Sequence, residues 1–136
     1  MGRLPQEYDD VPFTALEPGR ELRTTYHVSA ELVAEYDRLV GADRPSTTVP
    51  PWVFSTFRPM FQALGGRMEQ GSLHTRQRLV VHGRAPVGAV LDVVLLVTGA
   101  TERNGRRYVD LEISYTHEGA PVATTTATFL WGEATR

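Results

Sequence analysis

The sequence predicts an α+β domain in which a curved antiparallel sheet of about five strands wraps around one long apolar helix. The first observation is the stretch from Trp52 to Leu64, WVFSTFRPMFQAL, which is the most aromatic and least charged run and has Arg58 as its only charge. The second is that four strand-like stretches, each able to present one apolar face, follow this run. Helices segregated from a series of antiparallel strands are typical of α+β domains.

The length, composition and net charge of the chain limit the kinds of protein it can be. A chain of 136 residues has the length of one domain, and 41% hydrophobic with 22% charged residues is ordinary for a globular protein. The net charge of −2 argues against a nucleic-acid partner. No apolar run approaches the roughly 20 residues of a membrane span, and the N-terminal residues show no apolar signal segment. We therefore expect a cytoplasmic protein with no membrane partner.

The chain contains neither cysteine nor lysine. Disulfides, thiolate nucleophiles, cysteine-ligated metals and Schiff-base chemistry are thereby excluded. The four histidines show no short spacing of the kind that ligates a metal. We expect no metal and no cofactor.

The first part of the chain predicts an arm, a strand and an amphipathic helix. Residues 1–20 are rich in proline and lack periodicity, so we expect an irregular arm, pinned by Phe13 and Leu16, that precedes a single domain over residues 21–136. Residues 21–28 alternate as a strand does. Ser29 is a suitable helix N-cap, and Gly41 supplies the stop. The expected apolar face of this helix comprises Leu32, Tyr36, Leu39 and Val40.

Residues 42–51 form a loop by their proline, serine and threonine content, and Pro50-Pro51 lead into the apolar helix. Pro59 lies inside that helix, where proline removes a hydrogen bond and clashes with the preceding turn. The helix therefore either kinks there or gives way to a second helix that starts near Arg58. Gly65-Gly66 end it.

The second half predicts four strands in antiparallel order. Asn104-Gly105 is the strongest hairpin signal, and Glu118-Gly119 marks a second turn. The expected strands are residues 73–82, 90–98, 107–115 and 122–131, of which 90–98 has the most buried character. A single layer of sheet leaves its back exposed, so we expect at least a dimer.

Several stretches resemble the MaoC-like branch of the hotdog superfamily, in particular the N-terminal half of double-hotdog dehydratases and the related dehydratase subunits. SAELVAEYDRLVGADRP is similar to the helix before the family's Gly-Asp-x-Asn-Pro loop, and VPPWVF to the entry of its central helix. LHTRQRLVVHGRAPVGAVLDVVLLVTGATERNG and YVDLEISYTHEGAPVATTTATFLW follow the course of its strands. The resemblance covers roughly residues 21–131.

The resemblance implies an acyl thioester, carried on coenzyme A or an acyl carrier protein, as the ligand. Members of the family hydrate or dehydrate such thioesters with an Asp and a His from an Asp-x-Asn-Pro-x-His motif. Backbone N–H groups at the start of the central helix polarise the thioester carbonyl, as helix N-termini can. Here that start is expected near residues 49–53. The family also implies a homodimer, or a heterodimer with another hotdog subunit.

This sequence departs from the family motif at its catalytic positions. Aligning Gly41 and Pro45 places Ala42 at the family Asp and Arg44 at the Asn, and no His follows Pro45. Either the chain is a non-catalytic partner subunit, or its chemistry lies on other residues.

Asp43 and His74 are the candidate catalytic residues. Asp43 is the only carboxylate of the loop and stands one place from the family position; otherwise it is a solvated Asp or pairs with Arg44. His74 opens a strand and could serve as acid or base, or simply bond to backbone.

The candidate substrate-binding residues lie at and around the central helix. Arg58 is suited to a carboxylate or phosphate, or alternatively to a structural pairing. The others either line an acyl tunnel or fill the core: Val49, Trp52, Val53 and Phe57.

Three hypotheses follow from the sequence. The first is a dehydratase or hydratase of fatty-acyl or polyketide thioesters. The second is a non-catalytic hotdog subunit that completes a catalytic partner. The third is a hotdog thioesterase, in which a carboxylate directs water at the thioester carbonyl.

Overall fold

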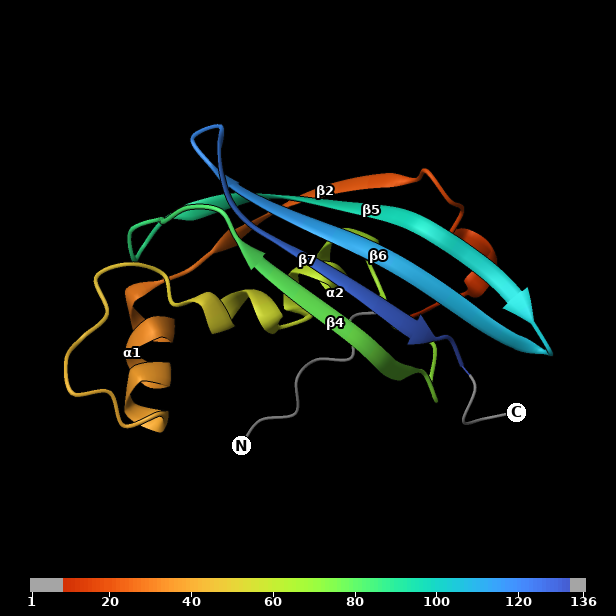
Figure 1. Cartoon of the computed structure of the whole chain (residues 1–136), viewed down its shortest axis with the longest axis horizontal. Helices are drawn as coiled ribbons and strands as arrows, with labels where there is room; N and C mark the ends of the chain where they lie inside the picture. Colours follow the sequence, from red (N-terminus) through yellow and green to blue (C-terminus); the bar gives the residue numbers. More distant parts are fainter. Residues whose placement is uncertain (1–8, 133–136) are drawn as a thin grey trace.

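A five-stranded antiparallel sheet forms the body of the computed structural model, which describes residues 9–132. The strand order is β2-β5-β6-β7-β4, and two short helical segments lie against the inner face of the sheet (Figure 1). The strands are β2 (Glu21–His27), β4 (Leu73–Val81), β5 (Val90–Arg103), β6 (Arg106–His117) and β7 (Ala120–Leu130). The predicted fold class is confirmed.

Tight turns join the three central strands. Asn104 and Gly105 both have positive φ (52° and 75°), as do Glu118 and Gly119 (50° and 82°). Two successive residues with positive φ match the twist of a two-residue hairpin. Both turns lie where the sequence places them, and they hold β5, β6 and β7 in antiparallel register.

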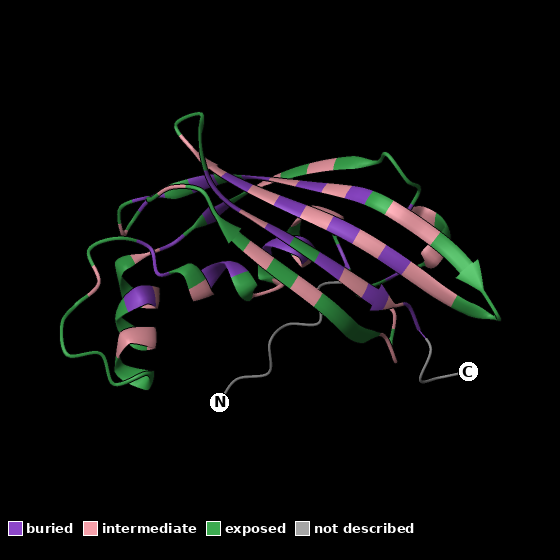
Figure 2. Cartoon of the chain, viewed as in Figure 1, coloured by how far each residue is buried: buried purple, intermediate pink, exposed green. Residues whose placement is uncertain are grey.

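The strands β5, β6 and β7 alternate between a buried inner face and a more exposed outer face. Figure 2 shows this as alternating bands along β6 and β7. The inner face of β5 and β6 consists of Leu91, Val93, Leu95, Val97, Val109, Leu111, Ile113 and Tyr115, all buried. Residues 90–98, expected to be the most buried of the four stretches, are buried at four positions, whereas residues 122–131 are buried at six, so this expectation is wrong. β5 is apolar on both sides but buried on one, and Val90 is 54% exposed.

The apolar segment forms two short helices in place of one long helix. A 3₁₀ helix, η2 (Pro51–Ser55), is followed by extended backbone at Thr56, and α2 (Arg58–Leu64) then begins. Pro59 lies in the first turn of α2, where its missing N–H is not needed. Of the two alternatives, the second helix near Arg58 is therefore the correct one.

The two helices provide the centre of the core. Val53, Phe54 and Met60 are at most 1% exposed, and the Phe54 ring packs 4.9 Å from the Tyr115 ring. The buried hydroxyl of Thr125 on β7 donates to the Phe54 carbonyl at 3.0 Å. This bond satisfies a carbonyl that would otherwise be buried without a partner, and it fixes η2 on the sheet.

The helix α1 (Ala30–Leu39) lies at one end of the sheet (Figure 1). Ser29 caps it by accepting from the Leu32 N–H at 3.1 Å. Its predicted apolar face is wrong in the last turn, since Val33 is the buried residue whereas Leu39 and Val40 are 72% and 64% exposed. The Tyr36 ring, which packs on Trp52 at 4.2 Å, links the helix to η2.

The described part of the arm packs on the opposite end of the sheet. β1 (Asp10–Val11) pairs in parallel with β3 (Arg67–Met68), a contact that the sequence did not predict. The Arg67 guanidinium bonds to Asp10 and holds the pKa of that carboxyl below its usual value. Of the two predicted anchors, Phe13 lies within the short helix η1 (Phe13–Ala15) and is partly buried against the core, and Leu16, just after η1, is buried. Residues 1–8 of the predicted arm lie outside the described residues.

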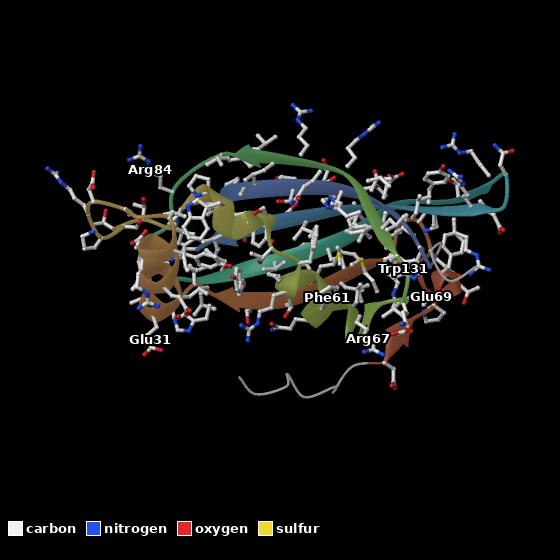
Figure 3. The ribbon with its side chains drawn as sticks, turned by 90° about the horizontal axis from the view of Figure 1, so that it is seen from below. Glu31, Phe61, Arg67, Glu69, Arg84 and Trp131 are labelled. Atoms are coloured by element: carbon white, nitrogen blue, oxygen red, sulfur yellow. The ribbon has the colours of Figure 1, made fainter. Side chains whose placement is uncertain are left out.

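The Trp131 side chain joins this arm to the end of the sheet. Its Nε1–H donates to the Val11 carbonyl at 2.8 Å, and the ring is fully buried. Figure 3 shows Trp131 near Glu69 and Arg67 at this end of the molecule. Within residues 9–132, no helix is both long and apolar enough to cross a membrane.

Replacing Thr125 with Val should lower the free energy of unfolding by about 1–3 kcal/mol, because the Phe54 carbonyl then stays buried without a donor. Thr126→Val is the matched control, since Thr126 is an exposed neighbour on the opposite face and should change little. Urea denaturation measures both. Equal effects of the two substitutions would contradict the role of the bond.

The Tyr115 hydroxyl is buried, and no hydrogen-bond partner for it exists among the described residues. Burial raises the pKa of this phenol, so it stays protonated when the unfolded chain ionises near pH ~10. Tyr115→Phe should therefore leave stability at pH 7 unchanged or raise it by about 1 kcal/mol. It should also reduce the loss of stability as pH rises above ~10. A clear destabilisation at pH 7 would show that the hydroxyl has a bonding role.

Candidate functional site

The start of the apolar segment has few free backbone donors. Pro50 and Pro51 have no amide N–H, the Val49 N–H donates to the Ala85 carbonyl at 2.8 Å, and the Val53 N–H donates to the Pro50 carbonyl at 3.1 Å. An oxyanion site needs donors that are free to meet the developing charge. Four of the five positions in the predicted oxyanion region, residues 49–53, are thus without such a donor.

A polar pocket of about 320 Å³ lies where the end of β2, the start of α1 and one side of α2 meet. Such a volume is sufficient for a small ligand or part of a larger one. Its lining has one cation, several hydrogen-bonding groups and no carboxylate: Thr25, Tyr26, His27, Ser29, Leu32, Arg58 and Gln62.

Hydrogen bonds hold the walls of this pocket in place. Gln62, one turn after Arg58 on α2, donates from Nε2 to the Thr24 hydroxyl at 2.9 Å and to the Thr25 carbonyl at 3.2 Å. The Ser29 hydroxyl is engaged in capping α1. Helix α2 is thereby tied to the edge of the sheet, and this bond keeps Arg58 beside β2.

Arg58 and His27 are the groups of the pocket that remain available to a ligand. Both are exposed, and neither side chain has an ion pair or hydrogen bond with another residue in the range 9–132. Tyr26 is 7% exposed and bonds to Thr56. Burial raises the pKa of the Tyr26 phenol, although the Thr56 bond and the Arg58 charge act against it. The pocket therefore presents positive charge and neutral donors, which suits an anion.

The two candidate catalytic residues lie at opposite ends of the molecule. Asp43 is exposed in the loop that follows α1. The Asp37 carboxylate of α1 holds this loop in place, because it accepts hydrogen bonds from the Ser46 N–H at 2.8 Å and from the Ser46 hydroxyl at 2.7 Å. His74 is at the beginning of β4, and Figure 1 shows that β4 starts at the end away from α1. One chain does not bring these side chains together.

His74 is held by packing and by a backbone contact. Its Nε2 lies 3.0 Å from the Arg76 carbonyl, and its ring lies 4.9 Å from Phe57 and 5.2 Å from Phe129. Nε2 must donate in that contact. This environment agrees with the structural alternative for His74, while its catalytic role stays a prediction.

Of the predicted substrate-binding residues, only Arg58 lines the pocket. Val49 and Val53 are buried, Trp52 packs on Tyr36, and Phe57 packs between His74 and Phe129. Sequence reasoning did not group Tyr26, His27 and Gln62 with Arg58. The spacing of Arg58 and Gln62 was the available signal, because residues four apart share one face of a helix.

A carboxylate paired with an imidazole is present elsewhere, but not in a pocket. Among residues 9–132, the one such contact joins His117 to Glu118 at 4.0 Å in a surface turn. The same residues contain no cluster of three or more His, Asp or Glu side chains that could hold a metal ion.

Comparison with known proteins identifies the fold. No protein-family profile matches this chain, and no curated protein sequence matches it. Solved structures do match. An (R)-hydratase from A. caviae involved in PHA biosynthesis has a TM-score of 0.64 at 21% identity, over 85% of this chain and 96% of the hydratase.

Two further structures agree with this result. The unliganded R-hydratase from Pseudomonas aeruginosa has a TM-score of 0.68 at 16% identity, over 91% of this chain and 87% of that one. A chain of the 3R-hydroxyacyl-ACP dehydratase complex from Mycobacterium tuberculosis has a TM-score of 0.62 at 18% identity. The match covers 83% of this chain and 96% of that one. The chain therefore has the hotdog fold of MaoC-like dehydratases and (R)-hydratases, as the resemblance in its sequence implied.

Proposed function

We propose that this chain is a MaoC-like hotdog subunit that binds acyl thioesters and serves their hydration or dehydration together with a second subunit. The thioester is carried on coenzyme A or on the phosphopantetheine of an acyl carrier protein. The second subunit supplies the catalytic acid and base. The observation that carries this proposal is the pocket around Arg58, which has a cation and hydrogen-bond donors but no carboxylate.

The pocket supports binding of the carrier part of the ligand. Coenzyme A and phosphopantetheine both contain phosphate groups, and a guanidinium is the side chain best suited to bind phosphate through two parallel hydrogen bonds. Arg58 has no carboxylate partner within residues 9–132, so a phosphate would not have to displace one. The exposed imidazole of His27 adds a ring N–H donor at the same site.

The missing acid–base pair supports the need for a partner. Hydration or dehydration of a 3-hydroxyacyl thioester requires a base at the α-carbon and an acid at the β-oxygen, both within hydrogen-bond reach of the substrate. Asp43 and His74 do not meet this condition within one chain, since Asp43 lies beside α1 and His74 lies at the opposite end of the sheet. One of the structural neighbours is itself a complex, the 3R-hydroxyacyl-ACP dehydratase from Mycobacterium tuberculosis.

The pure chain should therefore neither add water to crotonyl-CoA nor release free thiol from acyl-CoA. It should raise the activity of a catalytically complete hotdog subunit that co-purifies with it. Absorbance of the enoyl thioester and a thiol reagent measure the two reactions. If the pure chain hydrates crotonyl-CoA and Asp43→Ala or His74→Ala abolishes this activity, the chain is a catalytic dehydratase or hydratase and the present proposal is wrong. Release of free thiol by the pure chain would establish the thioesterase hypothesis.

Replacing Arg58 with Gln should weaken the binding of coenzyme A by about tenfold, since a charge-assisted phosphate contact is lost at a site open to solvent. Arg44→Gln is the matched control, because Arg44 is an exposed arginine that does not line the pocket. Isothermal titration measures both dissociation constants. The assignment of the pocket is wrong if the two variants bind equally well.

A further inference from the structure

The hairpin that joins β5 to β6 extends beyond the strands on either side of it. β2 begins opposite Leu96 of β5, and β7 ends opposite Tyr108 of β6. The hairpin tip, residues 102–107 (ERNGRR), therefore projects at the end of the molecule away from α1 (Figure 1). Three of its residues are arginines and one is a glutamate. The tip is thus a basic segment in a chain whose net charge is −2.

Arg103 and Arg106 lie directly opposite each other in this tip. They are the last pair of the β5–β6 ladder before the turn at Asn104-Gly105. Residues paired in an antiparallel ladder share one face of the sheet, and their Cβ atoms are about 4.5–5.5 Å apart. Like charges in such a pair destabilise it. The hairpin therefore brings two guanidinium groups together at a cost to its own stability.

Both arginines belong to the outer face of the sheet. Val109 of β6 is fully buried, so Tyr108 beside it faces outward, and Arg106, two residues before Tyr108, shares that face. The Arg103 guanidinium lies 4.8 Å from the centre of the Tyr108 ring. A cation over the face of an aromatic ring is attracted to it. The tyrosine thus keeps one of the two guanidinium groups on the same face as the other.

No carboxylate of the described chain neutralises this pair. Glu102 lies opposite Arg107 and therefore on the inner face. Asp110, the next acidic residue on the outer face of β6, is about 14 Å along the strand from Arg106 and accepts a hydrogen bond from Thr128. Among residues 9–132, neither Arg103 nor Arg106 has an ion pair.

An uncompensated breach of a local pairing rule is expected at functional positions. Here the breach places two forked donors on one exposed face. Guanidinium groups bind phosphate through two parallel hydrogen bonds each, and a phosphate monoester carries close to two negative charges at neutral pH. One such group neutralises both arginines, whereas a single carboxylate would leave one positive charge unpaired. The chemistry that suits this pair is a dianionic phosphate.

We propose that Arg103 and Arg106 form a binding site for a phosphate monoester at the tip of the β5–β6 hairpin. The site is separate from the pocket around Arg58, because that pocket lies beside α1 at the other end of the sheet. The phosphate comes either from a small solute or from a phosphorylated side chain of another protein. The site does not depend on whether the chain binds acyl thioesters.

Titration of the ¹⁵N-labelled protein with inorganic phosphate at low salt tests the site directly. The backbone amide signals of residues 102–107 should shift and saturate, and Arg106→Gln should weaken the binding at least about fivefold. Without phosphate, the melting temperature of Arg106→Gln should be unchanged or about 1–2 °C higher, because the like-charge pair is removed. A lower melting temperature would show instead that the arginine supports the hairpin, and would contradict the proposal.

Arg76→Gln is the matched control, because Arg76 is an exposed arginine that lies opposite Thr128 and has no arginine across from it. This variant should bind phosphate at the hairpin tip as the wild type does. The proposal is wrong if the tip signals do not shift, or if Arg106→Gln binds as tightly as the control. Signals around Arg58 report the other pocket separately, so failure at one site is distinguishable from failure at the other.

A phosphoserine peptide distinguishes the two sources of the phosphate. If it saturates the same tip signals at a lower concentration than inorganic phosphate does, the natural ligand is a phosphorylated protein. Equal or weaker binding of the peptide assigns the site to a small phosphorylated solute. Added salt should weaken the binding of both ligands, since it screens exposed charges.

Discussion

The burial of one apolar segment against the inner face of the sheet is the interaction on which the rest of the structure depends. Val53, Phe54 and Met60 fill the concave side, and burial of each such side chain contributes roughly 1.5–3 kcal/mol. Without this segment, the inner faces of β5 and β6 would be exposed to water. The Thr125 hydroxyl bond to the Phe54 carbonyl then determines where the segment sits.

Prolines determine the course of that segment and, through it, the site. Pro50 and Pro51 set the start of η2, and Pro59 restricts α2 to a beginning at Arg58. The break between the two helices turns Arg58 and Gln62 toward the edge of β2. One consequence is a pocket with positive charge. Another is that Gln62 binds the Thr25 carbonyl of β2 and so ties α2 to that edge of the sheet.

Much of the fold could be predicted from local sequence. Asn104-Gly105 and Glu118-Gly119 allow positive φ at both turn positions, and alternation over β6 identifies its buried face. The pairing of β1 with β3 could not be found, because two residues on each strand show no periodicity. The last turn of α1 was mispredicted because the helix extends past the end of the sheet, where its apolar residues have nothing to pack against.

The site was less accessible to sequence reasoning than the fold. Arg58 was recognised because a single charge in an apolar run is conspicuous. Its companions Tyr26 and His27 come from a strand about thirty residues earlier, and only the tertiary structure brings them to α2. Asp43 and His74 were chosen by their positions in the chain, which say nothing of the distance between them.

The most direct test of the central claim compares two ligands on the unmodified protein. Coenzyme A has phosphate groups, whereas pantetheine has the same thiol arm without them. If the pocket around Arg58 binds the carrier, coenzyme A should bind at least about tenfold more tightly at low salt, and the difference should shrink as salt screens the charges. Equal dissociation constants for the two ligands at low salt would contradict the account.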